Sequence, residues 1–203
     1  MLKHFLLASV LLSFNFYLNA QELSYDITVA GKNVGSMLVT QKKLAEGKTY
    51  YSAVSEVEYS LFRTTNLVFL YEAIYQDGTL QNAYFIHKKN GEKEEEAKLE
   101  RIGMQSAYLG NKDGEKEKID GLLNTSMLQL YFSKPKQRDA VFSERFLDYV
   151  KIAKLPDENR YMFEIPNGDK SIYDYNEQGI CTKITIDSSF LKFEITLKTE
   201  GEK

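Results

Sequence analysis

Residues able to act as a nucleophile or a general base are scarce in this chain. It has one cysteine, Cys181, and two histidines, His4 and His87. A Ser-His-Asp or Cys-His arrangement would have to use His87, because His4 lies in a segment interpreted below as a leader. No Gly-x-Ser-x-Gly motif is present. His87 directly precedes Lys88 in a strand-like pattern, so we interpret it as a strand-end histidine and predict no catalytic residue.

Cys181 stands at the start of the strand predicted over Ile180–Asp187. It is in phase with Lys183 and out of phase with Ile184, which predicts a half-buried position. No neighbouring base or helix start would lower its thiol pKa, so we expect it to be inert. One cysteine excludes a disulfide within the chain and a cysteine-based structural zinc site. We therefore predict no metal and no cofactor.

Two groups of carboxylates have a spacing that a glycosidase could use. Glu56 and Glu58 share one strand face, and Glu94–Glu96 lie in a charged stretch. The chain has 29 acidic residues, so such pairs are expected by chance. It also has no tryptophan on which a sugar ring could stack. A hydrolase is therefore the weakest of three functional hypotheses.

Aromatic residues are the most abundant candidates for a binding site, with 14 Tyr and 12 Phe. Rings of this kind suit the pleated surface of a sheet. They can fill a core, or they can line a cavity for one small apolar ligand, as in some barrels. We keep both interpretations open. The candidate ligand-binding residues are six on strands and three on a predicted helix: Tyr51, Tyr59, Phe69, Tyr71, Tyr75, Phe85, Met127, Leu128 and Tyr131.

Alternation of apolar and polar residues with a period of two runs through most of the chain and predicts strands. About eleven strands follow one another, and most of the turns between them are short. Short turns join antiparallel neighbours. A sheet of this size should curl. The predicted fold is mainly β: a large curved antiparallel sheet or half-open β-barrel with one short helix on its concave face.

Three segments carry the remaining structural predictions. Leu122–Phe132 has apolar residues at helical spacing, Asn124 or Thr125 as a helix cap, and Pro135 as a stop. The segment 66–76 is apolar on both faces, which predicts cover on both sides, with the helix as a natural partner. The segment 140–152 is predicted as one strand, and 104–109 as another.

The N-terminus is typical of a secretory leader. Met1–Ala20 has Lys3 near its start, a short apolar run and a small residue at its end. We expect cleavage after Ala20 and a single β-rich domain over residues 21–203, in the periplasm or secreted. Gln21 is not a cysteine, so no lipid anchor is expected. The apolar run is too short and interrupted to span a membrane, so no integral span remains after cleavage.

The charge of the expected mature chain is modest. It has 25 basic and 29 acidic residues, a formal charge of about −4, which argues against a nucleic-acid partner. The segment 88–118 holds eight basic and eight acidic residues in alternation. This mixture predicts solvated hairpins that extend past the core.

Four short strings are distinctive: Tyr25–Gly31 followed by Val34-Gly35, Lys48–Tyr51, Tyr131–Pro135 and Val141–Glu144. Together they resemble an uncharacterised family of exported bacterial proteins, a domain of unknown function typical of Bacteroidetes-type species. The resemblance covers nearly all of the expected mature chain and implies an exported β-rich domain without catalytic residues. The chain is more distantly similar to periplasmic lipoprotein-localisation proteins, which have a curved sheet around a helix.

These observations support three functional hypotheses. The first is non-catalytic binding of a lipid, an acyl chain or an apolar protein segment between the sheet and the helix. The second is a structural or assembly protein of the cell envelope that contacts a partner protein through the charged hairpins at 88–118. The third is the hydrolase discussed above.

Overall fold

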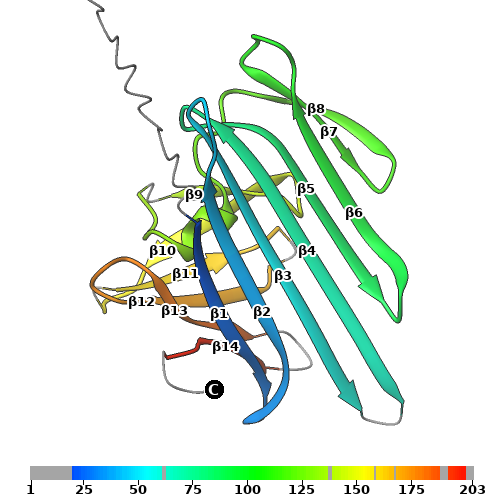
Figure 1. The fold of residues 1–203 in the computed structure, drawn as a ribbon, viewed down its shortest axis with the longest axis vertical. Helices are drawn as coiled ribbons and strands as arrows, with labels where there is room; N and C mark the ends of the chain where they lie inside the picture. Colours follow the sequence, from blue (N-terminus) through cyan, green and yellow to red (C-terminus); the bar gives the residue numbers. More distant parts are fainter. Residues whose placement is uncertain are drawn as a thin grey trace, which may run out of the picture.

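One antiparallel sheet accounts for nearly all of the described chain (Figure 1). The computed structural model describes residues 20–60, 63–136, 139–157, 159–166, 168–187 and 192–199. The predicted leader, apart from Ala20, and the last four residues lie outside these ranges. The described residues form fourteen strands: β1 Ala20–Val29, β2 Lys32–Lys43, β3 Lys48–Ser60, β4 Thr64–Gln76, β5 Thr79–Lys89, β6 Glu92–Arg101, β7 Ala107–Lys112, β8 Glu115–Asp120, β9 Ala140–Ser143, β10 Asp148–Lys154, β11 Arg160–Glu164, β12 Lys170–Tyr175, β13 Cys181–Asp187 and β14 Lys192–Leu197.

The sheet consists of two meanders that meet at its middle. Strands β1 to β8 follow one another on one side, β9 to β14 follow one another on the other, and β1 pairs with β14. The long strands β1 to β6 form one wall, and the shorter strands β9 to β13 lie behind it at a steep angle (Figure 1). The curved sheet predicted from the alternation and the short turns is confirmed.

The two edges of the sheet, β8 and β9, do not pair, and the barrel stays open. The segment that links them contains the 3-10 helix η1, Met127–Tyr131, and its residues Leu123, Ser126, Leu128 and Leu130 are buried. Leu123 accepts a hydrogen bond of 2.8 Å from the backbone N–H of Leu80 on β5. Ser126 forms an isolated parallel bridge with Phe142 on β9. The link therefore spans the gap between the two walls.

The helix is shorter than predicted and begins later. Ser126 has extended backbone, with φ −135° and ψ 173°, and precedes the first helical residue. Its backbone N–H donates to Oε1 of Gln129 at 3.3 Å, as in a capping box. Leu123 is hydrogen-bonded to β5 and Ser126 itself bridges to β9. These contacts keep the intervening backbone non-helical and prevent a helix start at Asn124 or Thr125. The helix contacts β3, β4 and β9 from the concave side, as predicted.

The strand count of about eleven was too low for two reasons. The predicted strand 140–152 is broken into β9 and β10 by a turn at 144–147, in which Leu147 has a φ of 53°. No separate strand was predicted over the exposed β8, which begins within the charged stretch 88–118. The strand expected at 104–109 begins only at Ala107, because 102–106 form a turn.

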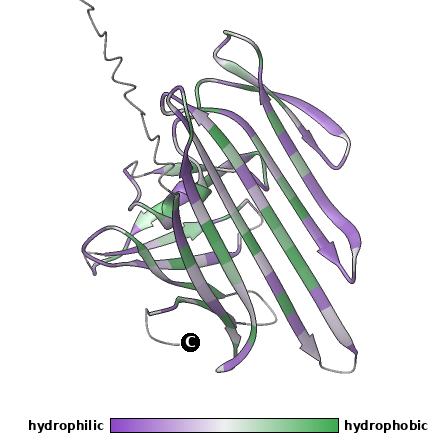
Figure 2. Cartoon of the chain, in the orientation of Figure 1, coloured by the Kyte–Doolittle hydropathy of each residue, from purple (hydrophilic) through white to green (hydrophobic). Residues whose placement is uncertain are grey.

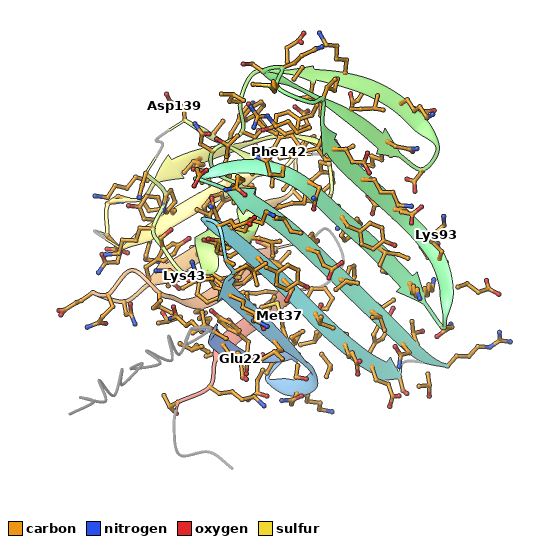
Figure 3. All side chains as sticks on the ribbon, turned by 45° about the horizontal axis from the view of Figure 1, so that its top comes forward. Glu22, Met37, Lys43, Lys93, Asp139 and Phe142 are labelled. Atoms are coloured by element: carbon orange, nitrogen blue, oxygen red, sulfur yellow. The ribbon has the colours of Figure 1, made fainter. Side chains whose placement is uncertain are left out.

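Among the described elements, only η1 packs across a face of β4, so the cover expected on its second face is not found in the described part of the chain. The inner face of β4 packs on the helix, but its outer face joins an apolar row that crosses four strands in register, Leu38, Val54, Leu70 and Ile86. Leu38 is 43% exposed and Val54 36%. Figure 2 shows green, hydrophobic stretches in the middle of these strands. Lys93 marks the turn between β5 and β6 on the same long-strand wall (Figure 3).

The core lies on the concave face and is rich in buried tyrosines, three of which donate hydroxyl hydrogen bonds to distant parts of the chain, whereas the buried Tyr175 hydroxyl has no partner among the described residues. Tyr25 donates to the carbonyl of Cys181 at 2.8 Å, and Tyr108 donates to the carbonyl of Leu80 at 2.9 Å. Tyr75 donates to Oγ of Ser126 at 2.7 Å. Buried hydroxyls without partners are costly, so these bonds tie distant strands and the helix to one arrangement.

Candidate functional site

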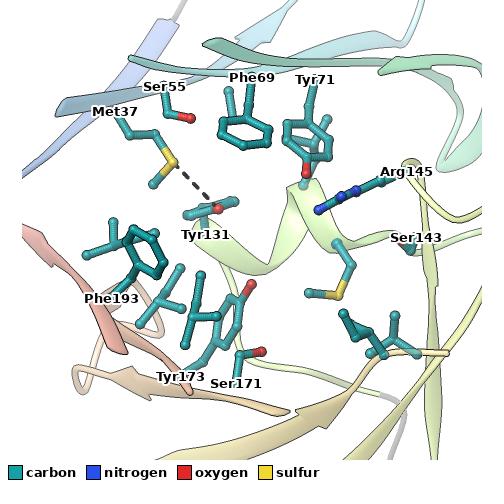
Figure 4. Close-up of a pocket in the computed structure, with 18 of the residues that line it drawn as sticks. Met37, Ser55, Phe69, Tyr71, Tyr131, Ser143, Arg145, Ser171, Tyr173 and Phe193 are labelled. Carbon is teal, nitrogen blue, oxygen red and sulfur yellow. Dashed lines mark hydrogen bonds between the residues drawn. The ribbon is translucent and has the colours of Figure 1, made fainter. Parts of the chain in front are cut away.

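A cavity of about 380 Å³ lies between η1, the long strands and the C-terminal strands (Figure 4). Its volume falls within the range of roughly 300–1,000 Å³ that is usual for small-molecule sites. Most of its lining is apolar. The residues that line it are Ile27, Met37, Ala53, Ser55, Val57, Leu67, Phe69, Tyr71, Met127, Leu128, Tyr131, Ser143, Arg145, Phe146, Val150, Ile165, Asp169, Lys170, Ser171, Tyr173, Ile184, Ile186, Phe193 and Ile195.

Three parts of the fold contribute to this lining. Odd-numbered residues of β2 to β4, such as Met37, Ser55 and Phe69, point inward because side chains alternate along a strand. Tyr173 and Phe193 face them from β12 and β14 (Figure 4). The helix supplies the third side. The cavity is the space that the two walls and the helix leave unfilled.

The structure divides the nine predicted ligand-binding residues into two groups. Five of them line the cavity: Phe69, Tyr71, Met127, Leu128 and Tyr131. The other four lie beside it in the core, where Tyr51 packs edge-on against Tyr75, Phe85 lies 4.6 Å from the Tyr71 ring, and Tyr59 is partly buried. Whether any of the nine contacts a ligand stays a prediction.

One end of the cavity is polar and is organised by Arg145. This residue lies in the turn between β9 and β10, and its guanidinium points into the cavity toward the Tyr71 hydroxyl (Figure 4). Its Nε and Nη2 contact Oε2 of Glu95 at 2.9 and 2.8 Å. The other Glu95 oxygen lies 3.4 Å from the Lys112 ammonium. The guanidinium carbon also lies 5.4 Å from the centre of the Phe85 ring.

The charge states at this end follow from burial and pairing. Burial opposes the charge of Arg145, but the hydrogen bonds to Glu95 and the proximity of Tyr71 outweigh it and raise its pKa. Burial raises the pKa of Tyr71 to about 12, against the opposing effect of the Arg145 charge. Arg145 is therefore a cation and Tyr71 a neutral hydroxyl at any physiological pH.

Two more tyrosine hydroxyls lie at the cavity. Tyr131 lies 3.7 Å from the sulfur of Met37, and Tyr173 stands opposite it (Figure 4). Burial raises the pKa of both hydroxyls well above the ordinary value. They offer neutral polar atoms within an otherwise apolar lining.

His87 lies on the inner face next to this polar end. Its ring stacks on Phe69 at 4.3 Å with an interplanar angle of 3°, and it pairs in register with Glu95. Its Nε2 is buried and has no partner among the described residues. Burial and the Arg145 charge lower its pKa. This arrangement is that of a packed neutral histidine with no nucleophile paired to it in the described chain.

The carboxylate pairs considered for glycosidase chemistry are separated or already paired. Glu96 faces outward and contacts Lys93 at 3.2 Å and Lys98 at 3.1 Å, whereas Glu95 faces inward to Arg145. Glu56 and Glu58 are both exposed on the outer face of β3. None of these groups forms a facing pair of carboxylates across a cleft.

Cys181 is fully buried, so the prediction of a half-buried thiol was wrong. The register between β12 and β13 shifts at this point, since Tyr175 pairs with Cys181 but Asp174 pairs with Lys183. The bulge skips Thr182 and brings Cys181 to the same face as Ile184. Alternation alone placed it on the opposite face.

The buried thiol should not react in the folded protein. Burial raises the pKa of Cys181 far above its ordinary value, and the side chain has no exposed surface. We expect no modification by Ellman's reagent during the time in which the urea-unfolded chain reacts completely. Rapid reaction of the native protein, measured at 412 nm, would contradict the buried position.

Arg145 is the functional candidate that the sequence reasoning missed. It was counted within a continuous strand, where a charge would face solvent. A signal was available, because Glu144-Arg145 interrupts the otherwise apolar stretch Val141–Leu147. Tyr173 and Phe193, on the C-terminal side of the cavity, were predicted to lie in strands but were not among the candidate ligand-binding residues.

Among the described residues, no helix has the length and apolar character that crossing a membrane would require. No curated protein matches the chain. The fold is similar to the crystal structure of a β-barrel-like protein of the domain of unknown function DUF1849 from Brucella abortus. That similarity has a TM-score of 0.58 at 12% identity and covers 90% of this chain and 96% of that one. The expected likeness to an uncharacterised family with a curved sheet is confirmed. Residues 25–198 match the family model of a domain of unknown function, and the chain belongs to that family, DUF6134.

Proposed function

We propose that this protein binds an apolar small molecule, a lipid or acyl chain, in the cavity beneath η1, and that it does so as a non-catalytic exported protein. The observation that carries the proposal is a cavity of about 380 Å³ lined mainly by aliphatic and aromatic side chains. A predominantly apolar lining favours apolar guests, because binding removes apolar surface from water. A cavity of this volume suits a chain or small molecule better than a protein segment.

The helix is suited to act as the movable side of the cavity. It has only five residues, too few for stability of its own, and it contacts the wall through side chains such as Tyr131. The strands opposite it are joined by continuous backbone ladders. Entry of a ligand would therefore displace η1 before it opens the sheet.

Neutral alcohols of increasing length test the proposal without involving a charged head group. Each methylene that enters the cavity should contribute about 0.8 kcal/mol, roughly fourfold in affinity, until the space is full. Displacement of the fluorescent dye N-phenyl-1-naphthylamine measures this series. Affinity that does not change with chain length would refute binding in the cavity.

A single substitution should close the cavity. Ser55 lines it on β3, and Ser55→Trp would place an indole in the empty space. We expect dye uptake to fall by about tenfold or more, because the methylenes of a bound chain would lose their room. The matched control is Val54→Trp on the adjacent outer face, where the side chain is 36% exposed and uptake should not change. Equal uptake by both variants would place the dye elsewhere.

Protein purified from its own cell envelope gives an independent test. Native mass spectrometry should show a bound apolar molecule that the Ser55→Trp variant lacks. A ligand-free spectrum together with no dye uptake would refute the proposed function.

A further inference from the structure

The apolar cavity has one partly buried cation at its end, and this cation is held in place. Arg145 is fixed by two contacts to a single oxygen of Glu95, at 2.8 and 2.9 Å. A guanidinium has five N–H donors. Glu95 accepts from two of them and the Tyr71 hydroxyl is hydrogen-bonded to the same guanidinium, so donors still remain for a further acceptor on the side that faces the cavity (Figure 4).

The charges around Arg145 leave one positive charge uncompensated. Arg145 and Lys112 share one carboxylate, that of Glu95. Burial and the Arg145 charge lower the pKa of His87, and the Glu144 carboxyl is turned to the start of η1, where its Oε1 accepts the backbone N–H of Leu128. The ion-pair group of Arg145, Lys112 and Glu95 is therefore matched to one added negative charge. A phosphate monoester carries about −1.5 to −2 at pH 7 and would be compensated less well than a carboxylate.

We propose that the ligand is an acyl chain ending in a carboxylate, with the carboxylate bound by Arg145 and the chain lying along the apolar lining toward Phe193. This inference rests on the proposed function and specifies its ligand class. Tyr71, which borders the same end, supplies a neutral hydroxyl to the second carboxylate oxygen.

Lys170 is the other cation that lines the cavity, and it is less suited to this role. Its side chain is 53% exposed and lies 3.8 Å from Glu164, and Asp169 precedes it. The Arg145 side chain is 34% exposed and lies against the rings of Phe85 and Phe146. An ion pair with Arg145 is screened less by water than one at Lys170.

Four probes with the same chain and different head groups test the inference: dodecanoate, dodecan-1-ol, dodecyl phosphate and dodecylamine. The affinity of each probe is measured by its displacement of N-phenyl-1-naphthylamine from the wild-type protein. A charge-assisted hydrogen bond inside the protein should favour dodecanoate over dodecanol by about tenfold or more. Dodecylamine should bind most weakly, and dodecyl phosphate should not exceed dodecanoate.

Substitutions of Arg145 and Glu95 should change the carboxylate preference in opposite directions. Arg145→Met should reduce dodecanoate to the affinity of dodecanol or below it, because the Glu95 carboxylate remains, without changing dodecanol itself. Glu95→Gln removes the competing carboxylate and should strengthen dodecanoate binding severalfold. Arg160→Met is the matched control, because Arg160 is also paired to carboxylates, at 2.7 Å from Asp174, but lies outside the cavity lining. It should leave the preference unchanged.

The outcomes separate the failure of this inference from that of the proposed function. Equal binding of dodecanoate and dodecanol, abolished by Ser55→Trp, would overturn the inference and leave apolar binding intact. A preference kept in Arg145→Met and lost in Lys170→Met would also overturn it. If none of the four probes displaces the dye, or the dye does not bind, both fail.

Discussion

Replacing Gly35 by alanine should destabilise the protein by about 3 kcal/mol, because a Cβ atom at this position would collide with backbone. Gly35 lies on β2 opposite Ile27, where the register with β1 shifts. An added Cβ would overlap the carbonyl oxygen of Glu56 and lie 2.9 Å from Cα of Val57. Backbone atoms of β3 cannot rotate away, so β2 and β3 would have to separate and weaken their ladder.

Thermal and urea unfolding measure the Gly35→Ala effect, with a loss in melting temperature of about 10 °C expected for a domain of this size. Gly110→Ala on β7 is the matched control. Its Cβ would meet only side-chain atoms, the nearest being Cδ1 of Leu147 at 3.0 Å. These ends can shift, and both substitutions reduce unfolded-state entropy equally. A control as unstable as Gly35→Ala would show that backbone collision is not the cause.

Replacing Glu144 by alanine should cost a similar amount, about 3 kcal/mol, because it leaves buried donors without partners. Glu144 is 1% exposed and lies in the turn that follows β9. Its Oε1 accepts the backbone N–H of Leu128 at 3.2 Å, and Ser126 is hydrogen-bonded to the same carboxyl. The carboxyl therefore attaches the start of η1 to the short-strand wall, and urea unfolding at pH 5 measures its contribution.

Glu144 should also make stability depend on pH. Burial raises its pKa in the folded state, although hydrogen bonds from Ser126 and the helix start oppose the shift. A raised pKa favours the protonated form, so its stabilising contribution is complete below the unfolded pKa near 4.3 and is lost as pH rises through the folded pKa. Glu144→Gln cannot ionise. The wild-type protein should therefore lose stability relative to Glu144→Gln between pH 4 and 8.

The size of that loss reports the folded pKa, at about 1.4 kcal/mol for each unit by which it exceeds the unfolded value. Urea unfolding of both proteins at several pH values provides the measurement. A difference between them that stays constant from pH 4 to 8 would mean that Glu144 titrates as it does in the unfolded chain. Subtracting the unfolding free energy of Glu144→Gln from that of the wild-type protein at each pH removes the contributions of the other carboxylates.

Local residue patterns were sufficient for the fold class and for most strands. Apolar residues at every second position, such as Leu23, Tyr25 and Ile27, indicate which face of a strand packs on the core. Side chains alternate between the two faces with a period of two in any sheet. Turn signals such as Asn90-Gly91 similarly specify antiparallel neighbours. The predicted helix region was also correct, since its apolar residues require a docking surface. Its length was not, because pairing of Leu123 and Ser126 with distant strands competes with helix formation.

By itself, the sequence determined a curved antiparallel sheet with an aromatic concave face and a short helix against it, because these depend on neighbours in the chain. Only the tertiary structure decided that β1 pairs with β14, that a bulge turns Cys181 inward, and that Arg145 enters the cavity to meet Glu95 fifty residues earlier. The physical reason is that strand pairing and ion pairing across a curved sheet depend on how the two meanders meet. No local pattern of residues specifies how the two meanders pack, so the site could be identified only from the tertiary structure.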